Sequence, residues 1–176
     1  MKRSQSQNLY LSIGVVALGV FALGIFASAG TSSAMSHEDA PDAEALWEHI
    51  QEANYESWEP FPNAPEGFYE GTRPHGAQLR TFGNESAVAN PQAPPPGSIV
   101  VKENYTPNKE LVAVTVMKKV EGYDAENQDW FWVKYDPDGS VAEQEGMKLA
   151  GKVKSCIGCH ASAVGDDYLY TNDAED

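Results

Sequence analysis

The only two cysteines of this 176-residue chain lie in one short motif, Cys-Ile-Gly-Cys-His, at residues 156–160. This spacing sets the thiols about one helical turn apart, within reach of both vinyl groups of one haem, and carries His160 beneath the iron. Two other interpretations are a zinc half-site, which needs two more ligands, and a thioredoxin-like pair, which needs a βαβ setting. The motif favours one covalent c-type haem, attached at Cys156 and Cys159 with His160 as the iron ligand.

The amino terminus predicts export. A basic start, Met-Lys-Arg, precedes a stretch that is apolar from residue 9 to residue 29 apart from two serines, and it ends in Ala-Ser-Ala. Residues 1–29 are therefore expected to be a signal peptide cut after Ala29, or else an uncut membrane anchor. Because c-type haem is attached outside the bacterial cytoplasm, a periplasmic or otherwise exported location agrees with the haem motif. We expect residues 30–41 to be a flexible tether and residues 42–176 to form the haem domain.

The charge balance is strongly acidic, with 26 Asp and Glu against 12 Lys and Arg, for a formal net charge of −14. This charge repels phosphate backbones, so it excludes nucleic acid as a partner. It is compatible with a cationic redox partner and with small neutral ligands. A solvated acidic surface that keeps the protein soluble is the other explanation of the same charges.

The order of apolar runs and turn residues along the domain predicts an α+β fold. This fold is an antiparallel sheet flanked by a few helices, with one haem near the carboxyl end. Alternation along the aromatic strand places Trp130 and Trp132 on one face and Phe131 and Tyr135 on the other. The expected elements are a helix that opens at 41–44, irregular chain over 54–76, strands at 77–82, 98–103, 111–117 and 129–135, a helical turn at 85–90 capped by Asn84, and a final helix from about residue 142 into the haem motif.

This pattern separates the chain from the common haem proteins. Small helical electron-transfer cytochromes bind haem near their amino terminus and use a downstream methionine, but no methionine follows His160. Four-helix-bundle cytochromes place the motif near the carboxyl end, but the valine-rich centre does not suit a bundle.

Taken together, the segments resemble the cytochrome P-460 family and its relatives, the beta-sheet cytochromes c-prime. The resemblance covers most of residues 68–173 and depends on the order and spacing of several short segments. These are His75-Gly76 with 79–82, Gly-Ser-Ile-Val-Val-Lys-Glu at 97–103, Asp-Trp-Phe-Trp-Val-Lys-Tyr at 129–135, the haem motif, and Asp-Tyr-Leu-Tyr-Thr at 167–171.

The resemblance implies a homodimer with one pentacoordinate c-type haem in each pocket. P-460 members oxidise hydroxylamine, and the beta-sheet cytochromes c-prime bind nitric oxide and carbon monoxide. Three hypotheses follow: an enzyme that oxidises hydroxylamine or handles another small nitrogen compound, a nitric oxide-binding protein without turnover, and a periplasmic electron carrier.

Two further residues acquire roles through the resemblance. Lys102 matches the lysine that P-460 members bond to a haem meso carbon, a reaction that requires the neutral amine; the alternative is a solvated lysine at a strand end. Arg80 matches an arginine of the family, which implies contact with a haem propionate or the pocket; a surface salt bridge is the alternative.

The sequence does not decide which residues lie at the sixth coordination position of the iron. His75, Met117 and Met147 are the possible sixth ligands, although Met117 suits the core and His75 a turn. Glu143 and Glu145 are candidate bases for proton removal, or else part of a solvated helix face.

Overall fold

The computed structural model describes residues 41–164 and 167–171. The predicted leader at 1–29, and the predicted tether up to residue 40, lie outside these residues. Within the described ranges, no helix has the length and apolarity needed to cross a bilayer.

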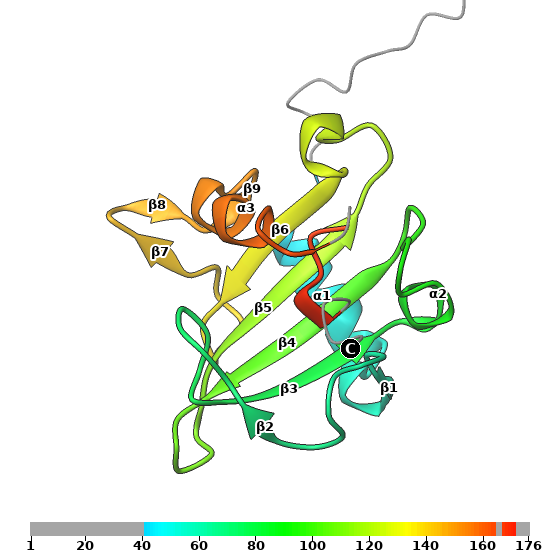
Figure 1. Cartoon of the computed structure of the whole chain (residues 1–176). Helices are drawn as coiled ribbons and strands as arrows, with labels where there is room; N and C mark the ends of the chain where they lie inside the picture. Colours follow the sequence, from blue (N-terminus) through cyan, green and yellow to red (C-terminus); the bar gives the residue numbers. More distant parts are fainter. Residues whose placement is uncertain (1–40, 165–166, 172–176) are drawn as a thin grey trace, which may run out of the picture. The chain divides into compact units, whose positions relative to one another are not determined.

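The predicted α+β class is confirmed. A twisted antiparallel sheet has the strand order β1-β3-β4-β5-β6-β9, and β2 pairs with β3 off this path (Figure 1). A separate hairpin pairs β7 with β8. The strands are β1 Glu59–Pro60, β2 Tyr69–Glu70, β3 Gln78–Gly83, β4 Ile99–Tyr105, β5 Leu111–Lys119, β6 Trp130–Tyr135, β7 Glu143–Gln144, β8 Met147–Lys148 and β9 Ala150–Gly151.

Three α-helices and two 3₁₀ turns accompany the strands in the described ranges. The predicted cap at Asn84 is confirmed, since its side chain accepts from the amide of Ala87 at 3.1 Å. The Asp42 side chain also caps a helix, accepting from the amide of Ala45 at 3.0 Å. The helices are α1 Ala43–Glu52, α2 Glu85–Ala89 and α3 Lys154–His160, and the 3₁₀ turns are η2 Tyr55–Ser57 and η3 Ala125–Asn127.

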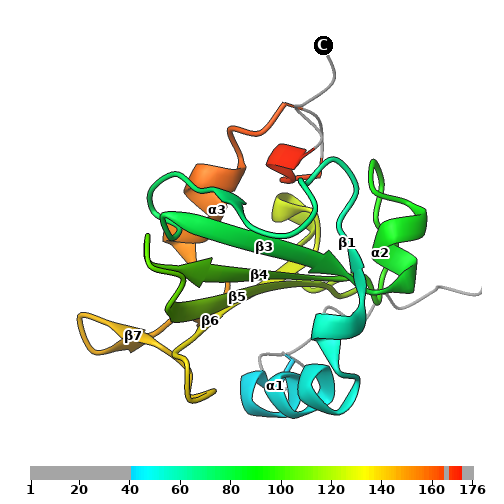
Figure 2. The same ribbon diagram turned by 90° about the horizontal axis from the view of Figure 1, so that it is seen from below.

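Helix α1 covers one face of the sheet, and α3 lies on the opposite face (Figure 2). The apolar stripe of α1 explains its position, because Leu46 and Ile50 are buried in the core on that face. Phe131, Val133 and Tyr135 of β6 belong to the same core, and the Tyr135 hydroxyl donates to the carbonyl of Ala43 at 2.6 Å.

A second apolar cluster lies on the face that carries α3. Trp130 and Trp132 belong to it, so the predicted separation of these tryptophans from Phe131 and Tyr135 is confirmed. The cluster comprises Phe61, Ala87, Val100, Met117, Trp130, Trp132, Val153 and Leu169. Side chains that alternate along each strand thus divide the protein into two cores on opposite sides of one sheet.

The prediction of a final helix from about residue 142 is wrong. The chain instead forms the β7–β8 hairpin and the short strand β9, and α3 begins only at Lys154. Glu145 and Gly146 have φ angles of 53° and 76°, and Gly151 has 99°, so the backbone turns where a helix would continue. Helical propensity over 142–150 is overridden by strand pairing, which includes Glu143 opposite Lys148.

A buried carboxylate ties β3 and β4 to η2 on the α1 side. Glu103 is only 2% exposed. It accepts from the hydroxyls of Tyr55 at 3.0 Å and Tyr105 at 2.8 Å, and Arg80 pairs with it at 3.2 Å. These partners offset the cost of burying the charge.

We expect Glu103→Ala to lower the free energy of unfolding by roughly 3–5 kcal/mol, because it leaves Arg80 and two tyrosine hydroxyls without their shared acceptor. Urea denaturation measures the change. Glu110→Ala is the control: Glu110 is exposed, so this variant should stay within about 0.5 kcal/mol of the wild type. Equal midpoints for the two variants would contradict this account of Glu103.

Candidate haem site

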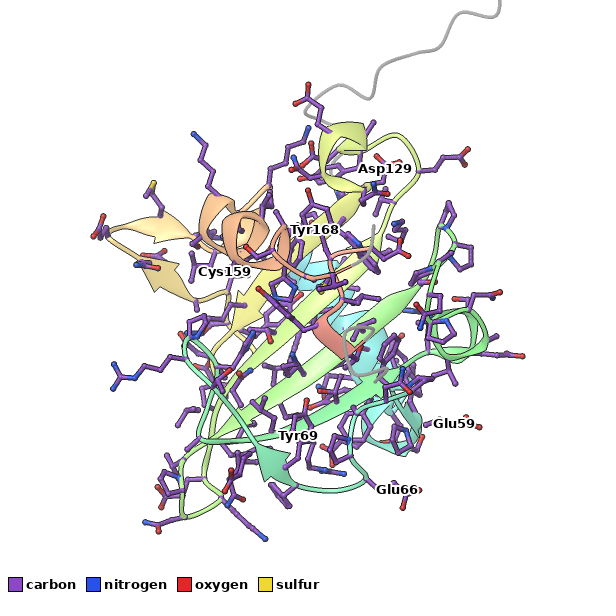
Figure 3. The ribbon with its side chains drawn as sticks, in the orientation of Figure 1. Glu59, Glu66, Tyr69, Asp129, Cys159 and Tyr168 are labelled. Carbon is purple, nitrogen blue, oxygen red and sulfur yellow. The ribbon has the colours of Figure 1, made fainter. Side chains whose placement is uncertain are left out.

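Helix α3 presents the whole Cys-Ile-Gly-Cys-His motif beside the sheet. Val153 is buried in the tryptophan-containing cluster, and Cys156 and Ile157 pack against that cluster. Both cysteines are free thiols; Cys156 is half-buried and Cys159 is exposed. The packing of one helix face therefore orients the motif toward the sheet. Cys159 on α3 and Tyr168 in the segment after it lie on the same side of the sheet (Figure 3).

The imidazole of His160 is held in one tautomer. Its Nδ1 lies 2.7 Å from the carbonyl oxygen of Tyr168. A carbonyl only accepts hydrogen bonds, so Nδ1 carries the proton and Nε2 keeps its lone pair. The ring contacts Trp132 with centroids 4.8 Å apart and Tyr170 at 5.5 Å. Burial lowers the pKa of His160, which favours the neutral, metal-binding form.

The segment that carries Tyr168 is itself attached to the sheet. Trp130 Nε1 donates to the carbonyl of Asp167 at 3.0 Å, and the Lys119 ammonium lies 3.5 Å from the Asp167 carboxylate. The Tyr170 hydroxyl donates to the carbonyl of Cys159 at 2.6 Å. The segment thus joins α3 to β5 and β6, which explains why the resemblance extended past the haem motif to residues 167–171.

A polar row crosses the face of the sheet below α3. Register places Thr81 opposite Lys102, Lys102 opposite Thr115, and Thr115 opposite Lys134. Directly opposed residues of antiparallel strands share a face, so both lysines lie on the face that carries α3. Burial lowers the pKa of Lys102 to about 8. The solvated strand-end lysine that was the alternative for Lys102 does not describe this environment.

The structure places Arg80 on the other face. It lies opposite Glu103 in the register, pairs with that carboxylate, and stacks over Phe82 at 4.7 Å. Arg80 is therefore not brought together with Lys102 and His160. Arg80 forms a salt bridge with the buried Glu103 rather than at the surface. Strand alternation explains its position, because the neighbouring Thr81 points to the α3 side.

The three possible sixth ligands lie in different environments in the structure. His75 lies beside His160, with ring centroids 6.2 Å apart. Burial, followed by the nearby charge of Lys102, lowers the pKa of His75 to about 4. Met117 is a buried core residue, whereas Met147 is 66% exposed on the β7–β8 hairpin. The candidate bases Glu143 and Glu145 are exposed on the same hairpin.

The site also contains residues that sequence reasoning did not assign to it. Asn104 accepts from the amide of Gly76 at 3.2 Å and pairs with the His75 ring at 2.9 Å. Lys134 shares the polar row with Lys102, and Tyr168 holds His160. Alternation along 102–104 could have identified Asn104, but the contact with Tyr168 depends on a turn that has no clear sequence pattern.

An orphaned donor on this face tests whether haem fits. Trp132 is 3% exposed, and its Nε1 has no hydrogen-bond partner in the part of the chain that the structure describes, whereas Nε1 of Trp130 is paired. A buried N–H normally has an acceptor, and a haem propionate would be an acceptor of suitable chemistry for this N–H. Within residues 41–164 and 167–171, no group of three or more His, Cys, Asp or Glu side chains is arranged to hold a metal ion. The two thiols and the imidazole of the motif therefore suit the iron of a haem better than they suit a zinc ion.

Two thiols on one helical face, an imidazole with a fixed tautomer and an apolar sheet face together characterise a c-type haem protein. The sequence profile of the family described as Cytochrome P460 matches residues 53–171, and the chain belongs to this family. No curated protein matched the chain. The match confirms the family predicted from the sequence, and haem c is the cofactor.

Replacement of Cys156 and Cys159 by alanine is expected to abolish covalent haem, because each thiol supplies one thioether bond. Haem staining of a denaturing gel and the pyridine haemochrome spectrum measure attachment after expression with a cytochrome maturation system. Ser155→Ala, at an exposed neighbouring position, should retain full attachment. Colourless wild-type protein would contradict the assignment.

Proposed function

We propose that this protein is an exported monohaem cytochrome that acts on small nitrogen compounds at the sixth coordination position of its iron, with hydroxylamine oxidation as the reaction. The observation that carries the proposal is the position of Lys102, which lies on the same sheet face as the haem motif and has a lowered pKa. Family membership supports it, because the match over residues 53–171 includes Lys102, the residue to which the resemblance assigns a bond with haem.

Haem supplies an iron that coordinates a small nitrogen ligand and accepts its electrons. The protein contributes a site that is apolar around Trp132 and Met117 and polar along the row of Thr81, Lys102 and Thr115. An apolar wall limits water, and the polar row provides hydrogen-bonding groups on the sheet face that carries the haem motif. Oxidation of hydroxylamine releases protons with the electrons, so a titratable group near the ligand assists the reaction.

Lys102 is proposed to bond to the macrocycle. Its neutral amine would supply the electron pair of a new C–N bond to a meso carbon. The new bond would replace one C–H and one N–H bond, so two electrons and two protons would pass to an oxidant of the peroxide class. Burial favours this reaction because it increases the fraction of neutral amine near pH 8.

Tryptic digestion of the mature protein should give a species that joins the Lys102 segment to the haem peptide. In freshly matured protein treated with peroxide, the initial rate of its formation should rise about tenfold per pH unit up to pH 8 and then level off, since that is where the pKa of Lys102 lies; with an ordinary lysine the rise would continue to about pH 10. Mass spectrometry of samples quenched at early times across a pH series measures the rate.

Lys102→Met should eliminate the joined species, and Lys134→Met, in the same polar row, should retain it. If wild-type protein gives no joined species at any pH, Lys102 is not a crosslinking residue.

The second candidate function is capture of nitric oxide without turnover, which the apolar wall of the site also favours. Hydroxylamine-dependent reduction of an artificial electron acceptor separates the two functions. We expect wild-type protein to turn over and Lys102→Met to lose at least about tenfold in kcat while still binding nitric oxide.

Nitric oxide binding without turnover in the wild type would favour the second function. A haem that neither turns over hydroxylamine nor binds nitric oxide would instead indicate an electron carrier and contradict the proposal.

The proposal extends to the setting of the protein. Export is inferred from the leader at residues 1–29, and a cationic redox partner from the net charge of −14. A homodimer is inferred from the family.

A further inference from the structure

The loop between β2 and β3, at residues 71–77, is attached to β4 by one buried side chain. Asn104 is 3% exposed. Its Oδ1 accepts from the amide of Gly76 at 3.2 Å and lies 2.9 Å from Nδ1 of His75. Because this oxygen only accepts, Nδ1 of His75 carries the proton. Asn104 therefore holds two successive residues of the loop.

The other end of the Asn104 amide is bound within the sheet. Its Nδ2 donates to the carbonyl of Lys102 at 2.9 Å, to the carbonyl of Ala113 at 3.3 Å and to the hydroxyl of Thr115 at 3.3 Å. The Thr115 hydroxyl in turn donates to the Lys102 carbonyl at 3.3 Å. One side chain thus connects the loop to the main chain of Lys102.

The loop and β4 also meet backbone to backbone. A Cβ atom on Gly76 would lie 2.4 Å from the amide nitrogen of Tyr105 and 2.6 Å from its carbonyl oxygen. The pairing of β4 with β5 changes register between Asn104 and Tyr105, and such irregularities reorient side chains beside functional sites. Only glycine allows the loop to approach the strand this closely.

Ionisable groups from four elements face Lys102. Tyr69 of β2 bonds to Thr81, which lies opposite Lys102, and Lys134 of β6 lies farther along the polar row. His75 comes from the loop and His160 from α3. Burial lowers the pKa of both imidazoles, and the charge of Lys102 lowers it further in each.

The position of the loop accounts for the environment of the Lys102 amine. His75 is close enough to Lys102 to respond to its charge, and burial alone lowers the pKa of Lys102 to about 8. If the loop moved away from β4, water would reach the amine and favour its charged form. The hydrogen bonds of Asn104 oppose that movement.

We propose that Asn104 is a positioning residue for Lys102, which holds the loop at residues 71–77 over the amine and excludes water from it. The inference rests on the proposed function for the bond between Lys102 and haem. The burial of the amine, however, can be measured whether or not that bond forms.

The pH dependence of crosslinking in the holoprotein is the first test. In Asn104→Ala, the pH at which the initial rate levels off should rise by about one unit or more from about 8, toward the ordinary lysine value near 10.4. The rate at pH 7 should then fall about tenfold, because the neutral fraction falls by that factor. Gly76→Ala, which displaces the loop but keeps Asn104, should shift the profile in the same direction.

Reductive methylation of the holoprotein before peroxide treatment is the second test. Mass spectrometry of the peptide that contains Lys102 gives the labelling rate across a pH series. The wild-type rate should level off near pH 8, and that of Asn104→Ala at a higher pH. Ile50→Ala is the matched control, because it removes a fully buried side chain from the core on the α1 face. It should lower the urea midpoint and leave both pH profiles unchanged.

Coincident labelling profiles for the wild type and Asn104→Ala would overturn the positioning role, as would an equal shift in Ile50→Ala. If Asn104→Ala does not fold, the profile of Gly76→Ala decides in the same way. A wild type without any joined species would contradict the proposed bond between Lys102 and haem. The labelling profiles would still decide the role of Asn104.

Discussion

The alternation of side chains along β4 is the constraint on which the rest of this structure depends. Glu103 points toward α1 and binds Arg80 and two tyrosines, while Lys102 and Asn104 point toward α3. A slip of one residue in register would exchange these sets, burying an unpaired carboxylate in the haem site. The Glu103 cluster therefore stabilises the fold and also holds Lys102 on the side where the haem motif lies.

The site is assembled from short polar contacts added to an apolar sheet face. Trp130 and Trp132 lie two residues apart on the same face, yet the N–H of Trp130 donates to the carbonyl of Asp167, whereas that of Trp132 has no acceptor among residues 41–164 and 167–171. The N–H of Trp132 is therefore available to an acceptor outside these residues. Side chains alternate along a strand with a period of two, so both rings lie on the same face of the sheet. Their hydrogen bonding differs because they contact different neighbours.

Sequence reasoning worked best where the local pattern and the tertiary environment agree. The cap at Asn84 and the strands β3 to β6 could be predicted because capping and alternation are local properties. It failed at residues 142–151, where the paired strands β7 and β8 replace an expected helix. It could not assign Arg80 to a face either, since that depends on pairing with Glu103, and pairing register is a long-range property.

By itself, the sequence determined the covalent chemistry of this protein: two thiols and one imidazole in five consecutive residues define a c-type haem attachment, because thioether bonding requires only that spacing. The tertiary structure alone decided which residues lie around His160. His75 and His160 are 85 positions apart in the chain yet have rings 6.2 Å apart. No local pattern predicts that proximity, because it arises from the packing of α3 and a loop against one face of the sheet.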